Sequence, residues 1–426
     1  MVDLNEHNAG DLFRAGLDPE SPRPPRVSIA TAIHDGRRRR TSRRLAVAGG
    51  AAVAIAVAVA VPAALAATRN DSAPPGLNPT APAASPYPAI TDTGTPGPTR
   101  SGPPIGATPG ASFAAPPFAE APTACDVHAL AGTADGTATL VTAGSPDGAV
   151  HFGQQYRKGE AAVEVVRWRA GQPAVVAVPG ADAEVVAVNN GGDAVGNSKL
   201  DGQPTAWRLR GDTVTPLPGP GEAYAHAVNV QGDVAGNRGA DDVRGRPVVW
   251  RGGNPYADLP LPAGATGGRA MAIDEWGSVF GSVAFGARVV PYSWAANGTG
   301  TQLPLPPNTG SATVTSARSG WATGTAGDGA SARPVRWSTL GGIVVVLEGI
   351  KPAPGEVNAN GMVLGRADDG RAVLLAGEKR IVLPAILDPT GDRPNLATAL
   401  SDDGRTIAGR ALGADGTVQA VVWTCR

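Results

Sequence analysis

The stretches AVNNGGDAVGN at residues 187–197 and AVNVQGDVAGN at residues 227–237 are near copies of each other. The pattern returns as AIDEWGSVFGS at 272–282 and EVNANGMVLGR at 356–366, and weaker copies begin near residues 142, 315 and 399. Every copy holds an aligned glycine, and these are Gly148, Gly192, Gly232, Gly277, Gly320, Gly361 and Gly404. Successive glycines lie 40 to 45 residues apart, so the region holds seven units of one repeat.

Each unit begins with a pattern that is typical of a tight turn. Asp, Asn or Ser followed three residues later by Gly is the signature of a type I turn, and short apolar runs flank it. We therefore expect each unit to open with a β-hairpin. The polar residues are Ser145, Asn189, Asn229, Asp274, Asn358 and Ser401. Ala317 departs from the pattern in the fifth unit.

Two further strands complete the expected unit. The third carries a tryptophan, as in PTAWRL and RPVVWRG, and the sixth unit has AVLLAG instead. These tryptophans are Trp168, Trp207, Trp250, Trp294, Trp337 and Trp423. The fourth run ends in proline, which suits an outer edge strand. Four short strands repeated seven times predict an all-β fold, a seven-bladed β-propeller of four-stranded blades. The alternative is an open β-solenoid, whose coils are usually shorter.

Once aligned, the units resemble those of bacterial extracellular repeat proteins of the HAF type, which read AxNxxGxxxG followed by Trp or Phe. The similarity covers about residues 125–425 and lies in AVNNGGDAVGN, AVNVQGDVAGN and the Trp-bearing strands. The His-Ala-Phe triplet that names the type is absent, and TAW, VVW and YSW stand in its place. The resemblance implies a propeller and an exported location, and it implies no activity.

The two cysteines suggest how the ring closes. The last unit ends with its third strand, AVVWTC, while the residues after Cys125, DVHALAG, have the pattern of a fourth strand. We therefore expect the N-terminal strand to complete the seventh blade, with Cys125 beside Cys425.

Register supports a bond between these cysteines. Aligning the last strand on the one that carries Trp207 puts Cys425 at the place of Leu209, and Cys125 falls at the place of Asp212. Leu209 and Asp212 flank a short turn, whose ends lie within about 7 Å. That separation is in or near the range of a disulfide. The sequence therefore predicts a Cys125–Cys425 disulfide, formed in an oxidising compartment.

The N-terminal part of the chain has a different composition. Residues 1–44 are polar and end in DGRRRRTSRR, and residues 45–68 carry no charge. The second segment is long enough to cross about 30 Å of hydrocarbon as a transmembrane helix, and the preceding arginines indicate that the N-terminus is cytoplasmic. The alternative is a cleaved signal, since residues 64–66, Ala-Leu-Ala, resemble a cleavage site. Both interpretations export the rest of the chain.

A spacer is expected between the membrane and the propeller. Residues 69–122 are rich in Pro, Gly, Ser, Thr and Ala, with almost no apolar periodicity. Such a composition cannot bury enough surface to fold, and its prolines favour extended polyproline II. We expect a disordered linker here and a monomeric propeller at residues 123–426, held at the cell membrane by a single pass.

Candidate binding residues are few. The tryptophans of the third strands recur in register, which favours packing between blades over an aromatic lining for carbohydrate. Trp276 and Trp321 lie in or beside the turns instead, so if exposed they are better candidates for a binding surface. His226 precedes the hairpin of the third unit and can lie near a face of the ring, although a lone His is usually an ordinary polar group.

Three pairs of adjacent acids offer further candidates, Asp241–Asp242, Asp368–Asp369 and Asp402–Asp403. Such pairs can bind a cation or act as general acid and base, but in glycine-rich loops they are more often turn formers. The sequence has no HExxH, no Cys/His pair at metal-ligand spacing and no GxSxG. We therefore predict no catalytic residue, no cofactor and no metal ligand.

Composition narrows the function without naming a ligand. A net charge of -1 gives no global argument for nucleic-acid binding. The first hypothesis is a membrane-tethered, extracytoplasmic binding or scaffold module for a protein, a wall polymer or a glycan, without enzymatic activity. The second is a carbohydrate-active hydrolase or lyase on a propeller scaffold. The third is a receptor whose short cytoplasmic tail reports binding.

Overall fold

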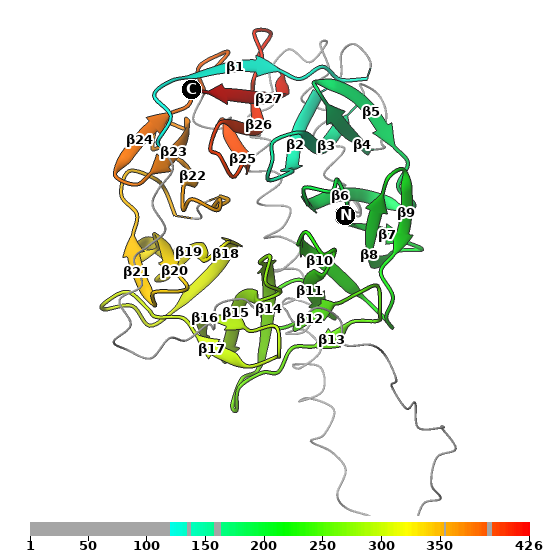
Figure 1. The fold of residues 1–426 in the computed structure, drawn as a ribbon, viewed down its shortest axis with the longest axis vertical. Helices are drawn as coiled ribbons and strands as arrows, with labels where there is room; N and C mark the ends of the chain where they lie inside the picture. The colour runs from blue at the N-terminus through cyan, green and yellow to red at the C-terminus, as the bar shows by residue number, and fades with distance from the viewer. Residues whose placement is uncertain (1–119, 134–137, 157–162, 353–354, 390–393) are drawn as a thin grey trace, which may run out of the picture. The chain divides into compact units, whose positions relative to one another are not determined.

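The computed structural model describes residues 120–133, 138–156, 163–352, 355–389 and 394–426. These residues form seven antiparallel sheets arranged as blades around one axis, a β-propeller (Figure 1). The predicted tail, transmembrane helix and most of the spacer, at residues 1–119, lie outside the described residues. In the described part of the chain, no helix is long and apolar enough to cross a membrane.

The first three blades follow one another along the chain, each with its innermost strand first. Blade 1 consists of β2 (Ala138–Gly144), β3 (Val150–Tyr156), β4 (Val163–Arg169) and β5 (Gln172–Val176). Blade 2 consists of β6 (Ala181–Val188), β7 (Ala194–Leu200), β8 (Gln203–Arg210) and β9 (Thr213–Pro216). Blade 3 consists of β10 (Ala223–Val228), β11 (Val234–Arg238), β12 (Arg246–Trp250) and β13 (Ala257–Asp258).

The remaining blades complete the ring. Blade 4 consists of β14 (Gly267–Ile273), β15 (Val279–Phe285), β16 (Arg288–Trp294) and β17 (Gly300–Gln302). Blade 5 consists of β18 (Ala312–Arg318), β19 (Trp321–Ala326), β20 (Arg333–Ser338) and β21 (Ile343–Val346), with the 3-10 turn η1 (Gly329–Ser331). Blade 6 consists of β22 (Val363–Arg366), β23 (Ala372–Ala376) and β24 (Lys379–Val382). Blade 7 consists of β25 (Leu396–Leu400), β26 (Thr406–Leu412), β27 (Val418–Cys425) and β1 (Cys125–Ala129).

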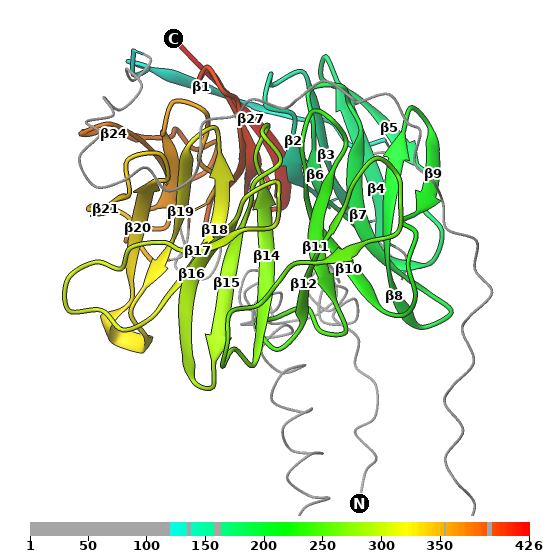
Figure 2. The same cartoon turned by 60° about the horizontal axis from the view of Figure 1, so that its bottom comes forward.

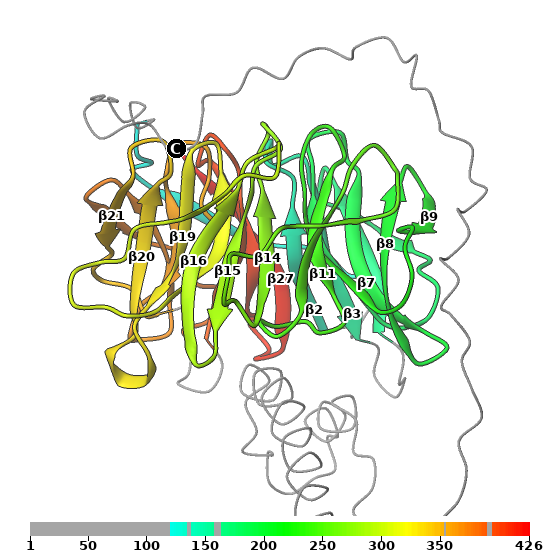
Figure 3. The same cartoon turned by 90° about the horizontal axis from the view of Figure 1, so that it is seen from below.

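The strands run along the axis between two ends of the ring (Figures 2 and 3). We call the end that carries the hairpin turns with the repeated glycines the turn end. We call the opposite end, where the second strand of each blade leads to the third, the loop end. Figure 1 shows β6, β10, β14 and β18 nearest the axis, so these innermost strands and the two ends position any site on it.

The predicted turns are present in six blades. In each, the glycine N–H donates to the carbonyl of the polar residue three positions earlier, as Gly232 does to Asn229 at 2.9 Å. Blade 5 differs, because β18 and β19 pair up to Arg318 and Trp321. Its two central residues, Ser319 and Gly320, both have positive φ, at 43° and 88°. Two such residues form the tight hairpin turn that matches strand twist, which explains why Ala317 departs from the pattern.

The strand tryptophans pack between blades, as predicted. Trp168, Trp250, Trp294, Trp337 and Trp423 are each at most 1% exposed. Each also donates its indole Nε1–H to a carbonyl that follows the outer strand of the preceding blade, at 2.7 to 2.8 Å. The accepting residues are Ala131, Pro218, Pro260, Pro304 and Pro384. The segment after the outer strand thus provides a carbonyl that accepts a hydrogen bond from the tryptophan of the next blade.

The second blade does not share this register, so the alignment on Trp207 was wrong. In blade 3, Trp250 pairs with Val234, two residues before the aligned glycine. In blade 2, Trp207 pairs with that glycine, Gly196, and Leu209 occupies the tryptophan position opposite Ala194. Glycine makes room for the shifted indole, since a Cβ on Gly196 would lie 2.3 Å from the Trp207 ring.

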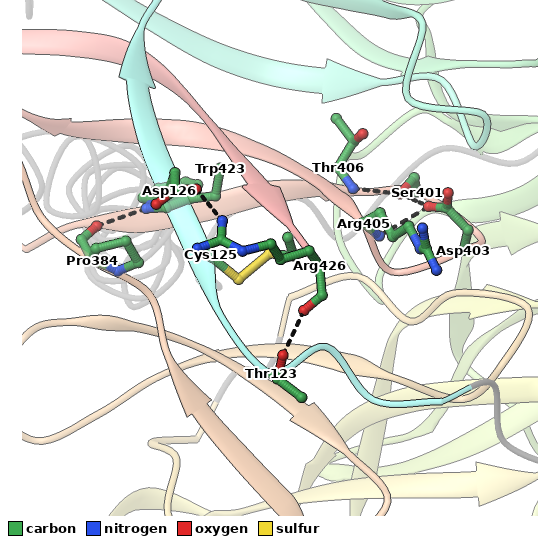
Figure 4. Close-up of a disulfide and its surroundings, with 11 residues drawn as sticks. Thr123, Cys125, Asp126, Pro384, Ser401, Asp403, Arg405, Thr406, Trp423 and Arg426 are labelled. Atoms are coloured by element: carbon green, nitrogen blue, oxygen red, sulfur yellow. Dashed lines mark hydrogen bonds and ion pairs between the residues drawn. A yellow bond between two sulfur atoms is a disulfide. The ribbon is translucent and has the colours of Figure 1, made fainter.

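The ring closes as predicted. β1 is the outer strand of blade 7 and pairs with β27, with Cys125 directly opposite Cys425. The two form a disulfide with a Cα–Cα separation of 4.0 Å (Figure 4). The Arg426 carbonyl also accepts hydrogen bonds from the Thr123 N–H at 2.7 Å and the Thr123 hydroxyl at 3.0 Å. The last strand and the first described strand are therefore joined covalently and by backbone pairing.

The register shared by the other blades also places Cys125 next to Cys425. Blade 5 has the common register, with Trp337 opposite Val344 as Trp423 lies opposite Val127. On that alignment Cys425 and Cys125 take the places of Thr339 and Gly342, which are three residues apart. The cysteines therefore replace a four-residue turn.

The sixth blade has the weakest inner strand. Its expected first strand is reduced to one bridge, between Val357 and Val363, so its sheet has three strands in the described residues. Leu375 takes the tryptophan position, opposite Val363.

Candidate functional site

A group of charged side chains lies at the turn end and is centred on Arg318, the last residue of β18. Its guanidinium contacts Glu275, in the turn of blade 4. It also makes a two-pronged contact with Asp402 in the turn of blade 7, from Nε to Oδ1 at 3.1 Å and from Nη2 to Oδ2 at 2.8 Å. The Arg318 side chain is 15% exposed. One arginine therefore links three blades.

The carboxylates of this group also bond to backbone. Glu275 accepts a hydrogen bond from the Val230 N–H of blade 3 at 2.8 Å, and Asp402 accepts one from the Ala359 N–H of blade 6 at 3.1 Å. Each therefore joins the turn of its own blade to the turn of the preceding one. Glu275 and Asp402 are thus fixed in position by backbone and by Arg318.

A third carboxylate, Glu356 of blade 6, stands beside them. Its Oε2 accepts a hydrogen bond from the Leu400 N–H at 2.8 Å, and it is partly exposed. Burial, with a smaller contribution from the Asp402 charge, raises the pKa of Glu356 to about 7, although the Leu400 N–H and the Arg318 charge act in the opposite direction. Glu356 therefore changes its charge near neutral pH, which is the property of a general acid or base.

Asp274, the turn residue of blade 4, has a structural role. It is 1% exposed, and its Oδ1 accepts hydrogen bonds from the Trp276 N–H at 3.0 Å and the Ser278 N–H at 2.8 Å. Burial raises its pKa to about 6. The equivalent Asn229 makes the same turn bonds and uses its amide to donate to the Asp274 carbonyl at 3.1 Å. Asp274 therefore serves mainly to hold its turn.

The two tryptophans singled out from the sequence have different environments. Trp276 lies in the blade 4 turn beside Glu275 and is half-buried. Trp321 is 4% exposed, packs against Leu347 and Val357, and lies with its ring 4.8 Å under the Arg336 guanidinium. Trp321 was a candidate for a binding surface only if it was exposed, and it is buried. Trp276 is partly exposed and remains a candidate.

His226 lies elsewhere, in the middle of β10. Its Nε2 is 3.1 Å from Asp241 Oδ1, and Asp241 also contacts Arg269 Nη2 at 3.1 Å. Burial raises the pKa of Asp241, but the hydrogen bond from His226 and the charges of His226 and Arg269 outweigh it, so the net shift is downward. These contacts couple blades 3 and 4 toward the loop end, away from Trp276 in its turn.

The acid pairs divide between turns and the axis. Asp242 contacts Arg244, and Asp369 accepts from the Arg371 N–H at 3.0 Å, as loop formers do. The Asp368 side chain is fully exposed. Asp403 likewise stabilises the turn of blade 7. It accepts hydrogen bonds from the Ser401 hydroxyl at 2.6 Å and from the Arg405 N–H at 2.9 Å (Figure 4). Only Asp402 joins carboxylates of other blades. Within the described ranges, no three His, Cys, Asp or Glu side chains are placed to hold a metal ion.

Sequence reasoning missed Arg318, Glu275 and Glu356. Nothing in the repeat marks them, because each lies in a different blade and only the ring brings them together. The one available signal was that the unit of Arg318 departs from the turn pattern. Together with Trp276, these residues bring carboxylates, a guanidinium and a half-buried aromatic ring to the turn end, which suits recognition of a polar ligand with hydroxyl or charged groups.

Comparisons with known proteins extend no further than the fold. No protein-family model matches the chain, and no curated protein matches it in sequence. A virginiamycin B lyase from Staphylococcus aureus is 14% identical over 71% of this chain and 99% of its own, with a TM-score of 0.49. The WD40 repeats of RRP9 are 13% identical over 72% of this chain and 100% of their own, with a TM-score of 0.47. These similarities indicate no activity or ligand for this chain.

Proposed function

We propose that the propeller is a rigid binding or scaffold module that works outside the cytoplasm, of the HAF type. Residues 45–68 anchor it in the cell membrane, and the proline-rich segment holds it at a distance from the surface. The disulfide at the seam supports this location, because such bonds persist in oxidising compartments. Its partner is a protein or a polymer of the cell envelope, and the propeller acts as a monomer.

The observation that carries the proposal is the convergence at the turn end. Side chains from blades 4, 5, 6 and 7 meet there, and Arg318 and backbone N–H groups hold the carboxylates in place. The half-buried Trp276 adds apolar contact area beside Glu275. A preorganised polar group beside an aromatic ring binds sugars or charged side chains without a large ordering cost.

An interaction screen with the full-length protein against envelope glycans and proteins tests the proposal. Ligands found in the screen are then tested on Trp276→Ala, with Asn190→Ala as the control, because Asn190 is exposed in the turn of blade 2 at the same end. Loss of binding with the first variant alone supports the turn end as the binding face. Equal binding by all three proteins would place the ligand elsewhere, and no ligand at all would count against a binding module.

A second candidate, a carbohydrate-active hydrolase or lyase, is favoured by Glu356. Its pKa of about 7 and its nearby carboxylate partner Asp402 provide a group able to donate or accept a proton near neutral pH. The same screen, followed for release of shorter products, decides between the two. Turnover that disappears in Glu356→Gln supports the enzyme, and binding without product supports the module.

A further inference from the structure

One position of the repeat links neighbouring blades through a side chain. This position directly follows the glycine near the centre of the second strand of each blade. In blades 1 to 5 and 7, that glycine pairs with the residue of the innermost strand that comes just before a β-bulge. We call it the post-glycine position. It is occupied by Gln154, Asn197, Asn237, Ser282, Thr325, Arg366 and Arg410.

In the first four blades this residue binds the innermost strand of the next blade. Gln154 donates to the Ala183 carbonyl at 2.9 Å. Asn197 donates to the Ala225 carbonyl at 3.0 Å and accepts from its N–H at 2.8 Å. Asn237 donates to the Gly268 carbonyl at 3.0 Å, and Ser282 accepts from the Val314 N–H at 3.0 Å. A short, neutral polar side chain therefore suffices to join two blades.

Blades 6 and 7 replace this neutral residue with arginine. In the part of the chain that the structure describes, neither the Arg366 nor the Arg410 guanidinium makes a hydrogen bond or an ion pair, and both side chains are partly exposed. Each guanidinium has five donors and remains charged in proteins. Two such groups without a described acceptor keep donors available for an anion.

The repeat geometry brings the two arginines together. A post-glycine residue is directed toward the innermost strand of the next blade, which for Arg366 is β25. That strand pairs with β26, where Leu396 lies opposite Arg410, so Arg366 is directed toward the strand beside the one that carries the second arginine. By the same rule, Arg410 is directed toward β2 of blade 1. In that strand, Ala138 pairs with Tyr156 of β3.

Electrostatics agrees with this placement. Burial is the main cause that lowers the pKa of Arg410, the charge of Arg366 lowers it further, and Tyr156 acts in the opposite direction. Burial also raises the pKa of Tyr156 to about 12, with Glu184 adding to the effect, so its hydroxyl stays neutral, and it donates a hydrogen bond to Gln154 Oε1 at 2.8 Å. Glu184 and Asp182 act on Tyr156, whereas the charges that act on Arg410 are those of Tyr156 and Arg366.

We propose that Arg366 and Arg410 form a binding site for an oxyanion, a carboxylate or a phosphate group, toward the loop end at blade 7. Guanidinium groups bind both anions through paired hydrogen bonds. The site is separate from the turn end, so it does not depend on the function proposed there. It accepts an anionic group of a larger ligand or a free anion.

Thermal unfolding and titration calorimetry of the full-length protein test this site, with inorganic phosphate and acetate as probes and chloride at the same ionic strength as the reference. Phosphate or acetate should raise the unfolding midpoint above that in chloride, and the stronger of the two identifies the preferred anion. Arg410→Gln and Arg366→Gln should each weaken binding by about tenfold or more, the loss expected for one charged hydrogen bond.

The variants are chosen to preserve the fold. Glutamine is the residue that blade 1 carries at the same position, where it joins two blades. Arg333→Gln is the control, because Arg333 is an exposed arginine of blade 5 on the same side of the ring, and its affinity should equal that of the wild type. Wild-type protein that gains no more stability from phosphate or acetate than from chloride overturns the proposal, and so does unchanged affinity in both glutamine variants.

Discussion

The seam of blade 7 offers the sharpest test of the fold, through replacement of both Cys125 and Cys425 by alanine. The disulfide closes a loop with a sequence separation of 300 residues. In the chain-entropy model, removal of a cross-link over so long a loop destabilises the folded state by roughly 6 kcal/mol at 25 °C. The five paired residues of β1 remain, so the native ring can still form without the bond.

That loss translates into a measurable shift. Unfolding entropies of about 2.1 cal/mol/K per residue mean that a domain of roughly 300 residues loses about 10 °C in its midpoint. The assay is urea and thermal unfolding of the full-length protein, oxidised and reduced, beside the alanine variant. Reduced wild type and the variant should agree.

A control separates the covalent bond from its surroundings. Asp126→Asn removes only the exposed ion pair with Arg426, and exposed pairs contribute no more than about 1 kcal/mol. A double alanine variant that loses no more than this control would refute the view that the disulfide holds the ring closed. Two titratable thiols in the native protein would do so as well.

Three further predictions follow from single contacts. Trp337→Phe should lower the free energy of unfolding in urea by about 1–3 kcal/mol, because the Pro304 carbonyl loses its donor. Trp207→Phe should lower it by less, because the Trp207 indole N–H has no partner among the described residues. Equal losses in the two variants would contradict this reasoning. Glu356→Gln should stabilise the protein at pH 8 but hardly at pH 4: its folded pKa of about 7 lies above the unfolded value of 4.5, so the native state binds the extra proton and stability falls as pH rises between the two values. Arg318→Met should destabilise by about 1–3 kcal/mol at pH 7 and by less where the carboxylates are protonated, while Arg405→Met, at an exposed arginine of the blade 7 turn, should not; a loss that is independent of pH would argue against the ion pairs.

Local features of the fold could be predicted because the repeat encodes them. The turn pattern, the strand tryptophans and the position of Cys425 led to the blade count, the closing strand and the disulfide. The error in blade 2 shows the limit of aligning on one side chain. Trp207 matches the other tryptophans in sequence, but strand pairing is set by the whole ladder, and the space above Gly196 admits the indole two residues out of register.

The candidate site could not be predicted in the same way. Arg318 and Asp402 are 84 residues apart in sequence and meet only because the ring closes. The burial of Trp321 depends on its contact with the next blade, where a Cβ on Gly361 would lie 2.8 Å from the indole. Such contacts follow from the curvature of the ring, which no single unit contains.

A repeat protein separates structure from specific function by position. A residue that recurs in every blade maintains the blade, as the turn asparagines and strand tryptophans do here. A residue that departs from the repeat is free of that role. Three kinds of departure in this propeller lie in blades 5 to 7: the turn with Arg318, the irregular inner strand with Glu356, and the two arginines at the post-glycine position. Because these departing residues supply charged groups at both ends of the axis, substitutions of them should alter ligand binding, whereas substitutions at the repeated positions of blades 2 and 3 should alter stability first.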